Sequence, residues 1–227
     1  MLDLRLPTHR RGFLGSVAAG AATLGLSGLV RPLALAGESV QGPAKEDPAL
    51  TAWLGKIKGR HRQVYDMPEV NGGFGLAWSR IFYMTNNETG VPDSDITIVA
   101  VLRHNALPLA FADSAWEKYK LGEVFHITDP KTKAPSVRNI FAHVQPDELP
   151  LPKMSVDELL ASAVLFGACN MAIKFYSGIV SKAQNVPVDQ VRQDWTAAVL
   201  PGIQIVPSGV WAVNRAQEHG CSYCFAG

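Results

Sequence analysis

The residue best placed to do chemistry in this sequence is Cys169. It follows the apolar run 163–168 and precedes a stretch from about Asn170 to Lys182 whose pattern predicts a helix. The unpaired amides and the dipole at the start of a helix stabilise a thiolate, which is the nucleophilic form of cysteine. We therefore expect Cys169 to be reactive. The alternative is a small buried apolar side chain, which is a common role for a free cysteine.

Cys221 and Cys224 have the Cys-x-x-Cys spacing of redox and metal-binding motifs. If this closing segment is extended, their α-carbons are about 10 Å apart, whereas a disulfide spans less than about 7 Å. The next residue is Phe225 rather than histidine, which excludes covalent haem attachment. Two uses of these thiols stay open: a redox-active dithiol, or a metal site completed by His219 and Cys169.

Two polar residues, Arg103 and His104, follow the apolar segment 96–102. In a parallel sheet the carboxyl ends of the strands meet at one edge, and ligands bind there. Two uses of Arg103 and His104 stay open: they supply positive charge to a small anionic ligand at this edge, or they simply solvate the edge. The sequence contains neither the glycine fingerprint of dinucleotide-binding proteins nor a phosphate-binding loop, and we expect no cofactor.

These residues must be positioned by strands and helices. Three segments rich in apolar and β-branched residues are predicted as buried strands: 96–102, 163–168 and 203–206. Stretches with helical patterns separate them, at a spacing typical of βαβ units around a parallel sheet. The sequence therefore predicts an α/β fold with helices on both faces of a mostly parallel sheet.

The ends of the helices are predicted from capping residues. Ser114 and Ser155 are each followed, three positions later, by a glutamate, which is the pattern of a capping box. Ser208 is placed to cap the last helix, and Gly220 suits the left-handed end of the same helix.

The first 36 residues have the three-part order of an export signal. After a charged start comes the uncharged, Gly- and Ala-rich segment 16–30, and the small residues Ala34 and Ala36 then mark a site for signal peptidase. The start resembles the twin-arginine (Tat) motif in four residues: Arg10, Arg11, Phe13 and Leu14. We expect the Tat translocase to export the chain to the periplasm, with cleavage after Ala36. The alternative is that the segment is retained as a membrane anchor.

The sequence divides into a signal peptide over 1–36, a flexible lead-in over 37–60 and one domain over 61–227. The signal holds four of the 21 basic residues and one of the 20 acidic residues, so the exported part is slightly acidic. This balance argues against a nucleic-acid-binding surface. No segment after the signal is apolar enough to span a membrane. The segment 128–151, with four prolines, is predicted as a long loop suited to partner contact.

From residue 96 onward the sequence resembles the DsrE/DsrF-like sulfur-relay family. The resemblance rests on four segments in order: 99–108, the strand–Cys169–Asn170 unit 164–170, 200–210 and 216–225. It implies a three-layer α/β sandwich, a relative of flavodoxin-like folds, with a mostly parallel central sheet. It also implies a homo-oligomer and a persulfide sulfur carried on Cys169, with Asn170 beside it.

Family members are typically shorter and cytoplasmic, whereas this chain has the loop 128–151, an additional helix within 185–199 and an export signal. Our main expectation is an exported, periplasmic sulfur carrier that acts through Cys169, with Arg103 or His104 near a small anionic or sulfur ligand. One alternative is a non-catalytic binding domain or oligomeric scaffold. Another is a thiol-based metal-binding protein.

Overall fold

The computed structural model describes residues 47–145, 148–162 and 164–227. The residues of the predicted signal and cleavage site lie outside this part of the chain: Arg10, Arg11, Phe13, Leu14, Ala34 and Ala36. Residues 37–46 of the predicted lead-in lie outside it as well. The predictions about export therefore stay predictions.

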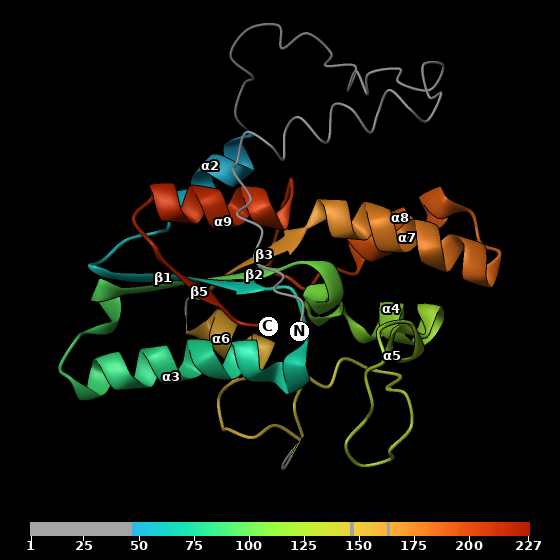
Figure 1. Ribbon diagram of the computed structural model, residues 1–227, viewed down its shortest axis with the longest axis horizontal. Coiled ribbons are helices and arrows are strands. Elements are labelled where there is room, and N and C mark those ends of the chain that lie inside the picture. Colours follow the sequence, from blue (N-terminus) through green and yellow to red (C-terminus); the bar gives the residue numbers. More distant parts are fainter. Residues whose placement is uncertain (1–46, 146–147, 163) are drawn as a thin grey trace, which may run out of the picture. The chain divides into compact units, whose positions relative to one another are not determined.

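Five strands form one parallel sheet (Figure 1). They are β1 (His61–Met67), β2 (Ile96–Leu102), β3 (Leu165–Cys169), β4 (Gln204–Val206) and β5 (Ser222–Phe225). Their order across the sheet is β4-β3-β2-β1-β5. The three predicted strands are thus neighbours that pair in parallel, which confirms the predicted α/β class.

The central strand β2 is buried along its whole length because its sequence has no polar face. Ile98, Ala100 and Leu102 belong to the larger of two core clusters, and Val99 and Val101 belong to the smaller one. Successive side chains of a strand point to opposite faces of the sheet. The two clusters therefore fill the two faces.

Helices cover both faces, which makes the fold a three-layer α/β sandwich. The smaller cluster is covered by α2 (Pro48–Leu54) and α9 (Gly209–Glu218), which lie on the same side of the sheet in Figure 1. The helices that contribute to the larger cluster are α3 (Phe74–Glu88), α4 (Asp113–Tyr119), α5 (Leu121–Val124), α6 (Val156–Ala161), α7 (Asn170–Gln184) and α8 (Val188–Ala197). The short 3₁₀ segments are η1 (Asn71–Gly73), η2 (Asp93–Asp95) and η3 (His104–Ala110).

The handedness of the connections explains this division of the helices. From β1 to β4 the chain moves in one direction across the sheet, and right-handed crossovers place all the intervening helices on one face. The return from β4 to β5 runs in the opposite direction, so the same rule places α9 on the other face.

The structure corrects part of the lead-in predicted over 37–60. Residues 48–54 form α2, which Asp47 caps by accepting a hydrogen bond from the amide of Ala49 at 2.9 Å. Trp53 and Leu54 are buried against the sheet in the smaller core cluster. The folded domain thus begins before residue 61, because two large apolar side chains anchor this short helix.

Three of the four capping predictions are confirmed. Ser155 forms the predicted capping box with Glu158, Ser208 accepts a hydrogen bond from the amide of Trp211, and Gly220 has a left-handed φ of 83°. The capping box at Ser114 is wrong. Helix α4 begins at Asp113, two residues before the start that a cap at Ser114 predicts, and Ala112 stands at its cap position without a side-chain hydrogen bond.

The described residues of the long loop 128–151 form neither a helix nor a strand, apart from one isolated bridge between Thr128 and Pro135. The loop is tied to the core by the buried side chain of Asn139. Its Nδ2 donates to the carbonyl oxygens of Leu109 at 3.0 Å and Phe111 at 2.8 Å. Among the described helices, none combines the length and the apolar character needed to cross a bilayer.

Candidate functional site at the carboxyl edge of the sheet

Cys169 lies where the sequence predicts it, at the junction of β3 and α7. It is the last residue of β3 and the N-cap of α7, and its Sγ accepts a hydrogen bond from the amide of Ala172 at 3.3 Å. An amide donor at the start of a helix favours the negative charge of a thiolate. The residue is 6% exposed and belongs to the larger core cluster, so the sulfur is largely shielded from solvent, as in the alternative of a buried apolar cysteine.

The topology makes this junction the natural ligand crevice of the sheet. β3 and β4 are neighbours, and Cys169 is paired in register with Val206. Helix α7 leaves β3 toward the face of the larger core cluster, whereas α9 leaves β4 toward the other face. In open α/β sheets, ligands bind where adjacent strands send their helices to opposite faces.

Arg103 follows β2 at the same edge and is held by a buried carboxylate. Its Nε donates to Oδ1 of Asp66 at 2.5 Å, and its Nη2 donates to Oδ2 at 2.9 Å. Tyr223 of β5 donates its hydroxyl proton to the same Oδ2 at 3.0 Å. Asp66 is 5% exposed, so the pair is largely shielded from water.

Charge on this network favours the cationic form of Arg103. The hydrogen bond to Asp66 raises the pKa of Arg103 more than burial lowers it, and the negative charge of Asp66 raises it further. Arg103 is therefore a permanent cation at the edge of the sheet where β3 ends in Cys169.

Gly209, the first residue of α9, allows Arg103 to reach this position. A Cβ atom at Gly209 would lie 2.5 Å from Cβ and 2.7 Å from Cδ of Arg103. The stem of Arg103 therefore packs directly against the start of α9. Any larger residue at position 209 would displace Arg103.

His104 belongs to a separate polar cluster. Its Nδ1 lies 3.3 Å from the hydroxyl oxygen of Tyr176 and 3.7 Å from Glu69. Tyr176 donates to Oδ1 of Asn105 at 2.5 Å, and Asn105 donates to Glu69. Arg103 and His104 are adjacent in the sequence but have different partners: Arg103 pairs with Asp66, and His104 lies against Tyr176 and Glu69.

Asn170, which the family resemblance places beside Cys169, is the first residue of α7 and is half-buried. Within the described part of the chain its side chain forms no hydrogen bond. It is therefore available to a ligand at the junction, in contrast to the engaged side chains of Asp66 and Tyr223.

The other two cysteines lie far from Cys169. Cys221 precedes β5 and Cys224 lies within it, and two strands separate β5 from β3, which corresponds to about 14 Å across the sheet. All three thiols are free. Burial raises the pKa of Cys221 to about 11, against a smaller opposing effect of Arg62.

His219 is exposed at the end of α9, where its Nδ1 lies 2.9 Å from the carbonyl oxygen of Arg215. The four residues weighed for a metal site, Cys169, His219, Cys221 and Cys224, do not come together. Across the residues that the structure describes, no three His, Cys, Asp or Glu side chains form a group that could hold a metal ion.

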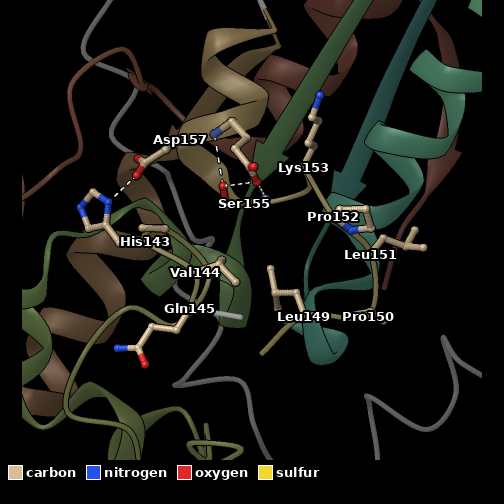
Figure 2. A pocket seen from close by; sticks show the side chains of 12 residues that line it. His143, Val144, Gln145, Leu149, Pro150, Leu151, Pro152, Lys153, Ser155 and Asp157 are labelled. Atoms are coloured by element: carbon tan, nitrogen blue, oxygen red, sulfur yellow. Dashed lines mark hydrogen bonds and ion pairs between the residues drawn. The ribbon is translucent and has the colours of Figure 1, made fainter. Parts of the chain in front are cut away.

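A cavity of about 910 Å³ is lined by residues from 142–145 and 149–158, and Cys169 is not among them (Figure 2). Four of its polar side chains are engaged at the start of α6: Ser155 and Glu158 form the capping box, and His143 pairs with Asp157 (Figure 2). These contacts are structural, and the residues lining the cavity include no cysteine.

We compared the chain with family models, curated proteins and solved structures, and none of these comparisons finds a match. Function is therefore inferred from the site itself.

Two residues of the candidate site, Asp66 and Tyr223, were not predicted from the sequence. A single aspartate at the end of a half-polar segment carries no signal of burial, because its partner Arg103 is 37 positions away.

Proposed function

We propose that this chain is a sulfur carrier, similar to the DsrE/DsrF-like family, that holds a persulfide on Cys169. The observation that supports it best is the environment of this thiol. Cys169 caps α7 with its sulfur, accepts a hydrogen bond from the amide of Ala172, and lies at the same carboxyl edge of the sheet as the cation of Arg103, where ligands bind in open α/β sheets.

The proposed reaction is a sulfur exchange without net oxidation. The Cys169 thiolate attacks the outer sulfur of a persulfide or polysulfide donor. A sulfur–sulfur bond forms on Cys169 while the donor's sulfur–sulfur bond breaks, and the donor leaves as a thiolate or a shortened polysulfide. The product on Cys169 is an anionic persulfide, whose charge Arg103 balances.

Asp66 and Tyr223 act as positioning residues in this proposal. They hold the guanidinium of Arg103 at the edge of the sheet and do not themselves touch the sulfur. The 6% exposure of Cys169 restricts access, and we infer that small inorganic polysulfides load it faster than bulky donors.

Export is the second part of the proposal. The Arg10–Arg11 motif and the small residues before position 37 support Tat transport and work in the periplasm. A carrier in that compartment would exchange sulfur with periplasmic rather than cytoplasmic donors and acceptors.

A second candidate function is a non-catalytic binding or oligomeric scaffold. It is favoured by three apolar side chains that lie along one exposed side of α7: Met171, Phe175 and Ile179, which are 55%, 62% and 45% exposed. Such a row is typical of a surface that another protein or a second copy covers. If Cys169 cannot be loaded with sulfur, the scaffold function is better supported than the sulfur carrier.

Sulfur transfer can be tested by cyanolysis. Protein loaded with polysulfide and then desalted should release one thiocyanate per chain with cyanide, because cyanide takes the outer persulfide sulfur and leaves the Cys169 thiolate. The Cys169→Ser variant should release none, and Cys224→Ser should behave as the wild type. Arg103→Met should load more slowly, by about three- to tenfold, and Arg103→Lys should recover part of the rate. Equal release from Cys169→Ser and wild type would refute the proposal.

A further inference from the structure

A second cavity, of about 450 Å³, opens beside the carboxyl ends of β1 and β2, and Cys169 is not among the residues that line it. Its apolar wall includes four buried side chains: Phe125, Ile127, Ile140 and Phe141. This volume and this composition are typical of small-molecule sites, which enclose about 300–1,000 Å³ and have mostly apolar walls.

Two carboxylates line the cavity, Glu69 and Glu148, and they differ in how far neighbouring cations neutralise them. The side chain of Glu148 is fully enclosed and is neutralised by Arg138, with Lys131 3.7 Å away. Glu69 is half-exposed, and its two oxygens accept hydrogen bonds from the neutral amide of Asn105 at 3.1 and 2.8 Å.

The side of the cavity that carries Glu69 has no compensating lysine or arginine. Within the described part of the chain, neither residue type lines the cavity. Nδ1 of His104 lies 3.7 Å from the Glu69 carboxylate, and His126 also lines the cavity. The cavity thus combines an apolar wall with the carboxylate of Glu69, whose oxygens can accept further hydrogen bonds.

Asn105 is itself held in place, so the polar side of the cavity is preorganised. Its Oδ1 accepts the hydroxyl proton of Tyr176 at 2.5 Å, and the ring of Tyr176 packs on Phe125 with 4.8 Å between centroids. The polar and apolar sides are therefore linked through one packed side chain. Preorganisation of this kind reduces the cost of ordering side chains on binding.

We propose that this cavity binds a small organic amine. The ammonium group would donate hydrogen bonds to Glu69, and its hydrocarbon body would lie against Phe125 and Phe141. A carboxylate or phosphate of the same size would be repelled by Glu69, because the lining offers no lysine or arginine to pair with it.

The test uses two probes of similar size and opposite charge, 2-phenylethylamine and 3-phenylpropionate, with isotope-labelled full-length protein followed by NMR. The amine should shift the amide signals of Gly72 and Ile127, and the carboxylate should not. Glu69→Gln should weaken amine binding about fivefold or more, since a neutral amide replaces the charged acceptor. The matched control is Glu117→Gln, an exposed acid on α4, which should leave the affinity unchanged.

Equal binding of the two probes, unchanged affinity in Glu69→Gln, shifts confined to other parts of the protein, or no binding of the amine would each overturn the proposal. The measurement scores amine binding and does not involve sulfur on Cys169. The amine site and the sulfur carrier can therefore fail independently of one another.

Discussion

Asp66 and Arg103 join the carboxyl ends of β1 and β2 through two parallel hydrogen bonds, at 2.5 and 2.9 Å. The side chain of Asp66 is 8% exposed and that of Arg103 is 26% exposed. Because Tyr223 of β5 donates to the same carboxylate, the pair connects three strands at the edge that carries Cys169. The position of the Arg103 cation at this edge thus depends on a buried acid.

Replacement of Asp66 should lower the stability of the fold. We predict that Asp66→Ala lowers the free energy of unfolding by about 2–3 kcal/mol, because it leaves the partly buried Arg103 without its partner. Urea denaturation measures the change. The control is Asp95→Ala, which breaks the exposed pair with Arg60 and should cost less than about 1 kcal/mol. Similar losses in the two variants would mean that the Asp66 pair is no more than a surface contact.

Two glycines in helices should respond in opposite ways to alanine. Gly209→Ala should destabilise the fold by about 1–3 kcal/mol, because the new Cβ would overlap the stem of Arg103. Gly178→Ala in α7 should be neutral or stabilising by up to about 1 kcal/mol, since a Cβ there meets no atom within 4 Å. Thermal unfolding of both variants checks this. If Gly209→Ala were as stable as Gly178→Ala, Arg103 would not pack against the start of α9.

Cys221 should be chemically inert in the folded protein. Its pKa is raised to about 11 by burial, so almost none of the thiol is ionised at about pH 8. Iodoacetamide at that pH should leave Cys221 unmodified in native protein and should label it after denaturation. The stabilisation due to the neutral thiol is present below pH 9.0 and is lost as the pH rises through about 11. Rapid native labelling of Cys221 would show that the end of α9 opens.

Export should depend on the arginine pair. Changing Arg10 and Arg11 together to lysine should leave the precursor in the cytoplasm, because the Tat receptor recognises the two guanidinium groups. Cell fractionation and the mass of the chain measure this, and the exported wild type should begin at Gly37. Unchanged export of the lysine variant would remove the Tat assignment.

The sequence predicts those elements whose chemistry is local. β2 is uniformly apolar, Ser155 and Ser208 are followed by the residues they cap, and Cys169 stands between a strand and a helix. β1 was missed because its first three residues are polar and only its last four are buried. Helix α2 was missed because its seven residues are held by tertiary contacts of Trp53 rather than by a helical pattern.

The candidate site was predicted only in part, because its contacts also depend on tertiary structure rather than on local sequence patterns. The sequence places Arg103 at the carboxyl edge, but the choice of Asp66 and Tyr223 as its partners depends on the strand order β2-β1-β5. This order is set by the return of the chain from β4 to β5, which no local pattern encodes. The separation of His104 from Arg103 likewise follows from the left-handed backbone of His104, with a φ of 50°.

The most direct test of the sulfur-carrier proposal is residue-level mass spectrometry of native protein treated with polysulfide. The peptide containing Cys169 should gain the mass of one sulfur atom, while fragmentation of the C-terminal peptide that carries both Cys221 and Cys224 should show no sulfur on Cys221. The adduct should be absent in Cys169→Ser and retained in Cys224→Ser. Added sulfur found only on Cys224, or on no cysteine at all, would contradict the proposal that Cys169 is the reactive thiol of this fold.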